Sequence, residues 1–188
     1  MGNKKYRSDY TLRYDADEKG RIKADAVYTG SRYRFAADEQ TRLRGAKRTV
    51  LFAAAAWLAW LLPLLVKSAA SHAFYIIFPQ VGSGIALWYL TLGAAAFLRG
   101  GESLSRKQSE QLQNRLGGGC AVSMMLAAVS FVGCVVFLLQ NGAAAGDVLF
   151  ALGAAAQTVC CALAWREREA ARTVPCTPEA DPAEKYGA

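Results

Sequence analysis

Four long apolar runs separate the charged segments of the chain. They cover residues 49–66, 73–98, 120–139 and 146–165, and no Asp, Glu, Lys or Arg lies deep within any of them. An α-helix rises about 1.5 Å per residue, so about 20 residues cross the hydrocarbon core of a bilayer. The pattern therefore predicts an α-helical integral membrane protein with four transmembrane helices.

The polar segment before the first run has a different period. Polar and apolar residues alternate in residues 10–14 and 21–29, which is typical of half-buried β-strands. Gly30 and Ser31 separate the second of these runs from a third β-rich run, and such a two-residue spacer indicates a hairpin. We therefore predict a small N-terminal cytoplasmic β-meander of three strands, in which the second strand pairs with the third.

One face of this predicted sheet is apolar and the other is basic. Three short strands are marginally stable alone, so the apolar face is expected to pack on a helix, a membrane surface or a partner. Each cation near an anionic membrane contributes about 1 kcal/mol of binding; the alternative is a solvated face whose charge only enforces topology. The residues that we expect to contact anionic lipid head groups or a partner are Arg13, Arg21, Lys23, Arg32, Arg34, Tyr28, Tyr33 and Phe35.

Two polar connections are also predicted to be helical. Residues 36–48 are acidic early and basic late, as the helix dipole prefers, and are expected to continue into the first span through Gly45. Residues 103–116 contain a Ser-x-x-Gln capping box and are predicted to form a short amphipathic helix on the membrane surface. We expect the glycines at 117–119 to end that helix.

The second span contains residues that favour a bend. Pro79, Gly82 and Gly84 all lie in its first half. Proline removes one helical hydrogen bond, which a membrane helix tolerates when its neighbours satisfy the freed carbonyl. We therefore predict a kink or an irregular start in this span, with the regular helix beginning near Val81.

The distribution of charge predicts the orientation. The chain has a net charge of +7, and its first 48 residues hold 13 Lys and Arg against 7 Asp and Glu. The segment 67–72 has one Lys or Arg and 140–147 has none, whereas 99–119 and the residues after 165 have four each. Because basic loops stay cytoplasmic, both termini are expected on the cytoplasmic side, in the plasma membrane.

These patterns divide the chain into three parts. Residues 1–48 are predicted to form the basic sheet and its linker helix, and residues 49–166 the membrane domain. Residues 167–188 carry mixed charge and three prolines, so a disordered tail is expected.

Residues that could carry chemistry are scarce. The single histidine, His72, lies in a predicted outer loop, and Ser83 lies in a Gly-Ser-Gly sequence without a His or Lys base in another span. Ionisable groups within a membrane mark ion paths and proton relays, and the four runs contain none at depth. We therefore expect no catalytic set and no proton-coupled or ion transport. Nucleic-acid binding is not expected either, because acidic residues interleave with the basic ones and no recognition helix or ribonucleoprotein motif is visible.

The five cysteines form no CxxC pair. Cys120, Cys160 and Cys161 lie near the cytoplasmic ends of their spans, so they are expected to approach each other. Thiol redox chemistry, metal binding and acylation are the alternatives to simple packing. Three thiols without a His or carboxylate make a poor metal site, so we expect neither a metal nor a cofactor.

Gln157 is the polar residue that would be most costly to expose to lipid. We predict that it faces another helix and makes a hydrogen bond there, a contact worth about 0.6–2 kcal/mol.

For the whole chain we expect a non-enzymatic accessory, scaffold or regulatory subunit of a membrane complex. The alternative is one protomer of an oligomeric transporter or channel for small or apolar solutes. A third hypothesis is a lipid-modifying enzyme that uses loop residues such as His72.

Overall fold

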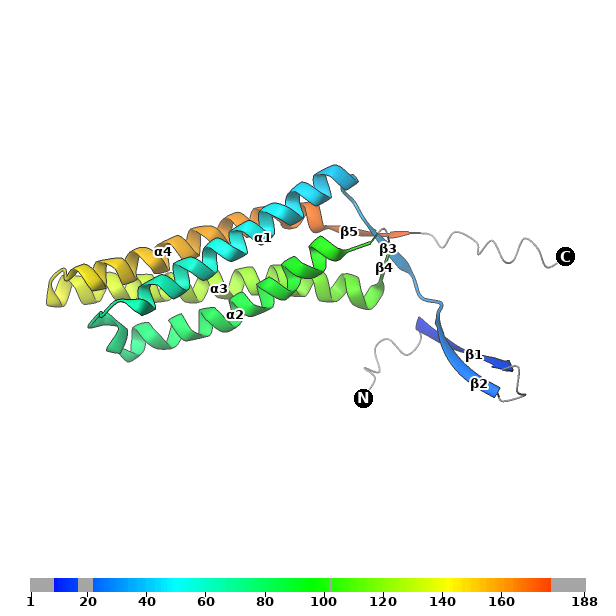
Figure 1. Cartoon of the computed structure of the whole chain (residues 1–188), viewed down its shortest axis with the longest axis horizontal. Helices are drawn as coiled ribbons and strands as arrows, with labels where there is room; N and C mark the ends of the chain where they lie inside the picture. The colour runs from blue at the N-terminus through cyan, green and yellow to red at the C-terminus, as the bar shows by residue number, and fades with distance from the viewer. Residues whose placement is uncertain (1–8, 17–21, 102, 177–188) are drawn as a thin grey trace.

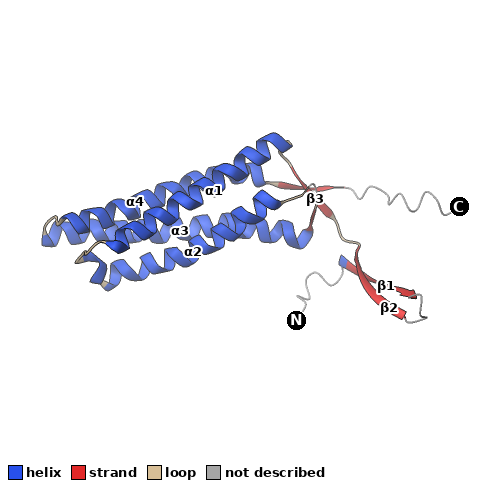
Figure 2. Cartoon of the chain, in the orientation of Figure 1, coloured by secondary structure: helices blue, strands red, loops and turns tan. Residues whose placement is uncertain are grey.

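The computed structural model describes residues 9–16, 22–101 and 103–176. The chain is mostly helical, with four helices packed along one another and short strands at one end of this bundle (Figures 1 and 2). All four helices are long and apolar enough to cross a membrane, by length and composition. Their bounds are α1 Glu39–Leu61, α2 Phe74–Arg99, α3 Arg106–Asn141 and α4 Ala145–Arg166.

Helix α1 begins before the apolar run and continues through it. The Asp38 carboxylate caps it by accepting a hydrogen bond from the Thr41 N–H at 3.0 Å. Hydrogen bonding to Thr41 holds the pKa of Asp38 below its usual range. Gly45 lies where a Cβ would be 2.7 Å from the Ala170 Cβ, so it permits close packing rather than a break.

Helix α2 begins at Phe74, and the predicted start near Val81 is wrong. Pro79 lies inside the helix, close to its first turns. Pro79 is the sixth residue of α2, so its missing N–H removes one i→i−4 hydrogen bond, the one to the Tyr75 carbonyl. Pro79 and the following Gln80 are both buried against the other helices, so packing holds the segment in the helical conformation.

Helix α3 is also longer than predicted, since the glycines at 117–119 do not end it. The expected capping box is present: the Gln108 N–H donates to Ser105 Oγ at 3.3 Å, and the Ser105 N–H donates to Gln108 Oε1 at 2.9 Å. Gly119 packs directly on the backbone of Leu90 in α2. The close contact between α2 and α3 stabilises a helical glycine run that would be unfavourable in isolation.

The strands form two sheets rather than one meander. Strands β1 Tyr10–Ala16 and β2 Ile22–Tyr28 make an antiparallel hairpin in which Tyr10 pairs with Tyr28. Strand β3 Arg32–Phe35 does not pair with β2; it lies between β4 Leu104–Ser105 and β5 Thr173–Cys176. The predicted hairpin at Gly30 is therefore wrong. The reason is that Phe35 is buried in the end of the helical bundle, which carries β3 away from β2.

The tail is also corrected in part. Residues Glu167–Ala171 form a 3₁₀ helix, and β5 follows it. The Gln113 side chain donates to the Ala171 carbonyl at 2.6 Å, which ties this segment to α3. Pro175 is tolerated in β5 because this strand is at the edge of its sheet. The remainder of the predicted tail, residues 177–188, lies outside the described residues.

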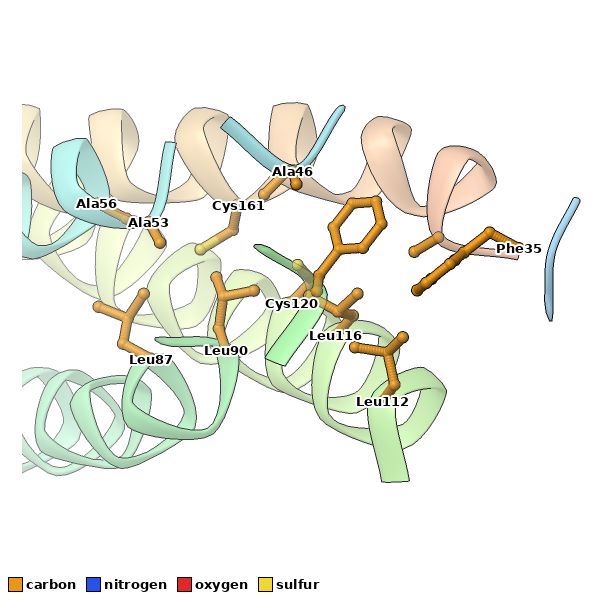
Figure 3. Close-up of a cluster of buried hydrophobic side chains, with 13 residues drawn as sticks. Phe35, Ala46, Ala53, Ala56, Leu87, Leu90, Leu112, Leu116, Cys120 and Cys161 are labelled. Atoms are coloured by element: carbon orange, nitrogen blue, oxygen red, sulfur yellow. The ribbon is translucent and has the colours of Figure 1, made fainter. Parts of the chain in front are cut away.

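Two apolar clusters hold the bundle together. The larger one lies toward the sheet and draws on all four helices; Figure 3 shows Phe35, Leu90, Leu116, Cys120 and Cys161 within it. The smaller cluster lies toward the opposite end, around Ile76, Cys134 and Phe150. Between the two clusters, buried polar side chains lie among small ones such as Ala127 and Ala154.

Candidate functional site

Four buried polar side chains meet between the two apolar clusters. Gln80 and Ser83 come from α2, Ser123 from α3 and Gln157 from α4, and each exposes at most 1% of its surface. The Gln157 Nε2 group donates to Ser83 Oγ at 2.9 Å and to Ser123 Oγ at 3.2 Å. Its Oε1 accepts from Gln80 Nε2 at 3.3 Å. Gln157 thus makes the interhelical hydrogen bonds expected of it, and we call these four residues the polar cluster.

The polar cluster also engages backbone carbonyls. Ser83 Oγ donates to the Gln80 carbonyl at 2.7 Å, and Ser123 Oγ donates to the Ser83 carbonyl at 3.3 Å. The Trp60 indole of α1 donates to the same Gln80 carbonyl at 2.8 Å. All four helices are therefore linked at this level. One acceptor, Gln80 Oε1, is buried without a hydrogen-bond partner among the described residues.

A second buried polar group lies at the end of the bundle opposite the sheet. The Asp147 carboxylate, in the first turn of α4, accepts from the Ser68 hydroxyl at 2.6 Å and from the Ala70 N–H at 2.9 Å. A Cβ on the neighbouring Gly146 would clash with the Lys67 carbonyl. These contacts fix the connection between α1 and α2 against the start of α4.

Two of the five cysteines pack inside the larger apolar cluster. Cys120 and Cys161 lie in the same apolar cluster, as expected from their level in the sequence, and expose 2% and 0% of their surfaces (Figure 3). The Cys161 thiol lies 3.5 Å from Ser123 Oγ at the edge of the polar cluster. Among the described residues, no group of three or more His, Cys, Asp or Glu side chains could hold a metal ion.

The predicted binding residues fall into three environments. Arg32 and Arg34 lie exposed on β3, whereas Tyr33 is half-buried. Phe35 is buried: its ring lies 5.7 Å from that of Phe97, and the Arg42 guanidinium lies 5.1 Å from its centroid. Phe35 therefore anchors the sheet to the bundle instead of contributing to an open apolar face.

Tyr28 ends the hairpin and contacts the bundle. Its hydroxyl donates to the Ser31 carbonyl at 2.9 Å and accepts from the Arg106 N–H, at the start of α3, at 3.0 Å. Arg13 lies on β1 at the position paired with Asp25, and Lys23 lies on β2 at the position paired with Asp15. Arg21 lies outside the described residues. The basic residues of the prediction are thus spread over two separate sheets.

The remaining candidates stand apart from one another. His72 is exposed in the connection between α1 and α2, while Ser83 is buried and bonded within the polar cluster. Sequence reasoning missed Gln80 and Asp147. The available signal for Gln80 was a glutamine inside an apolar run, whereas the prediction for this segment rested on the adjacent Pro79 and concerned only the bend of the helix.

No family model, curated protein or solved structure matches the chain.

Proposed function

We propose that this chain is a multi-pass protein of the plasma membrane, with four transmembrane helices and both termini in the cytoplasm. Two features support the proposal. The four helices have the length and composition of membrane spans. The arginines and lysines that flank them gather at the end of the bundle that carries the sheet, and Lys67 is the one Lys or Arg in the connection between α1 and α2. Basic flanks are retained in the cytoplasm.

Within the membrane, the proposed role is that of a non-enzymatic accessory or scaffold subunit whose β1–β2 hairpin docks on a partner protein. The observation that carries this role is the position of the hairpin, which projects from the bundle beyond the second sheet (Figure 1). Among the described strands, none pairs with the outer edge of β1 or of β2. A two-stranded hairpin is marginally stable in water, and a free edge accepts an added strand. A partner strand on this edge would stabilise the hairpin and bind by main-chain hydrogen bonds.

The polar cluster supports a structural role for the bundle. Its hydrogen bonds run from helix to helix and join α1, α2, α3 and α4 at one level. In lipid, helices associate through such bonds and through the close packing of small residues. The polar cluster therefore holds the spans together, and the resulting helical bundle carries the cytoplasmic hairpin.

A second candidate is one protomer of an oligomeric transporter or channel for small or apolar solutes. The observation that favours it is the unpartnered Gln80 Oε1, next to Pro79 and at the centre of the bundle. Buried polar groups without partners are costly, so each needs an explanation, and a passing solute would supply the missing bond here. In this case the assembly would consist of copies of this chain alone.

Deleting residues 1–27 tests the docking role. The deletion removes the hairpin but retains Tyr28, β3 and Phe35, so the bundle keeps its contacts with the sheet. We expect capture of the partner from native membranes to fall by about 10-fold or more, since the added strand accounts for its main-chain hydrogen bonds. A chain that lacks residues 177–188 is the control and should capture the partner normally.

The same chains must insert normally for this result to be read. Ala144→Cys, in the connection between α3 and α4, should react with a membrane-impermeant thiol reagent added outside intact cells, with or without residues 1–27. Partner capture that persists without the hairpin would refute the docking role. Labelling of residue 144 from the cytoplasmic side alone would refute the proposed topology.

A further inference from the structure

An apolar groove runs between α1 and α2 in the half of the bundle near the sheet. It has a volume of about 290 Å³. Small side chains, among them Ala54 and Ala95, leave it open, and Arg99 lies at its end. The Trp57 indole donates to Thr91 Oγ1 at 2.9 Å, which fixes this ring as part of the wall. The groove has the shape and chemistry to receive a hydrocarbon chain.

A second hollow lies between the end of α2 and the start of α3. It has a volume of about 320 Å³. Five of its lining residues carry hydrogen-bond donors in their side chains: Arg99, Ser103, Gln108, Gln111 and Arg115. None of its described lining residues is acidic, and Glu102 lies outside the described part of the chain. Within the described residues, neither arginine has an ion-pair partner.

Arg99 belongs to both hollows. The apolar groove and the donor-lined hollow therefore meet at Arg99, the last residue of α2. The helix dipole favours an arginine at a helix C-terminus, and this explains Arg99. It does not explain Arg115, because that residue lies within α3. One arginine at the end of the apolar groove and a second in the adjoining hollow match an amphiphile whose polar end is an anion.

We propose that these two hollows form a binding site for an anionic glycerophospholipid. The phosphate lies between Arg99 and Arg115, and one acyl chain lies in the groove along α1 and α2. A zwitterionic lipid would bring a cation into a hollow that already holds two, with no described carboxylate to offset it. The site rests on the proposed insertion of the four helices into a membrane, because that insertion brings lipid to this face.

Lipid titration of the full chain tests the site. The protein is purified in an uncharged detergent and titrated with dioleoylphosphatidylglycerol or dioleoylphosphatidylcholine, and the bound lipid is counted by native mass spectrometry. Each well-placed cation contributes about 1 kcal/mol toward an anionic lipid, which is about 5-fold in affinity. We therefore expect the anionic lipid to bind about 25-fold more tightly, and R99Q/R115Q to abolish that preference.

Two matched variants make the result specific. R44Q/R166Q removes two exposed arginines that line neither hollow, and it should retain the preference. Ala54→Phe fills the groove and should weaken binding of the anionic lipid, whereas Ala156→Phe, at an exposed alanine of α4, should not. Equal binding of the two lipids by the wild type, or an equal loss in R44Q/R166Q, would overturn the proposal.

The outcomes separate this site from the proposed function. Normal labelling of Ala144→Cys from outside, together with no lipid preference, would refute the lipid site and leave the topology standing. Failure of the chain to insert would refute the topology first. Loss of partner capture on removal of residues 1–27 involves neither Arg99 nor Arg115, so it reports on the docking role alone.

Discussion

Replacing Gly119 with valine is expected to lower the free energy of unfolding by about 3 kcal/mol, at the upper end of the range for overpacked cores. A Cβ at this position would lie 2.7 Å from the Leu90 nitrogen and 3.0 Å from its Cα. Both atoms belong to the backbone of α2, so no side-chain rotation relieves the clash. The two helices must separate, which opens the large apolar cluster around Leu90 and Cys120.

The neighbouring Gly118 provides the matched control. No heavy atom lies within 4 Å of a Cβ built there, and the residue is exposed. Gly118→Val makes the same change in helix propensity without the clash. For a chain of this size, about 3 kcal/mol corresponds to a fall of about 6–12 °C in the midpoint of thermal unfolding. Equal midpoints for the two variants, measured in an uncharged detergent, would show that α2 and α3 do not approach closely at Gly119.

Gln157→Leu is expected to lower the free energy of unfolding by about 2 kcal/mol, because each interhelical hydrogen bond in a membrane contributes about 0.6–1.7 kcal/mol. The substitution replaces the amide with a shorter apolar side chain and removes the bonds to Ser83, Ser123 and Gln80. The Nε2 group of Gln80 then has no acceptor, and an unsatisfied buried donor adds to the loss.

The adjacent Thr158 offers the comparison for Gln157. Its hydroxyl donates only to the Ala154 carbonyl within α4, at 2.8 Å, so Thr158→Val should change the midpoint of thermal unfolding by about 1 °C or less. Gln157→Leu should lower the same midpoint by about 4–8 °C. A stability for Gln157→Leu at or above that of the wild type would show that the polar cluster does not tie the helices together.

The helices could be predicted because each apolar run is long enough to cross a membrane as a helix, so its length and composition alone indicate the structure. The joining of residues 36–48 to the first run also follows from local signals, since Asp38 provides a cap and no residue between them ends a helix. The prediction that the glycines at 117–119 end a helix was wrong. Local propensity counts three costly residues there, whereas the fold uses Gly119 for close contact with α2.

The partners of the strands could not be predicted from the same patterns. Alternation identifies β3 as a strand, but it carries no information about which segment pairs with it. In the structure the two neighbours of β3 come from residues 104–105 and 173–176, which the intervening helices bring to the same end of the bundle. Proximity in sequence favoured pairing of β3 with β2. In the structure Phe35 is buried against Phe97, and this contact holds β3 at the end of the bundle, away from β2.

The candidate sites divide in the same way. Gln157 was identifiable because a lone glutamine in an apolar run must find a partner, but its partners Gln80, Ser83 and Ser123 lie on two other helices. The proposed lipid site depends on Arg99 and Arg115 meeting across α2 and α3. Such contacts depend on how the helices pack together, and the periodicity of residues within one helix carries no information about that packing.

The native mass of the tagged, full-length protein, purified in mild detergent from its own membrane, tests the central claim most directly. An accessory or scaffold subunit should be recovered in a complex with a different protein at fixed stoichiometry. Recovery of a complex that contains only copies of this chain would contradict the accessory role and would favour the transporter or channel protomer.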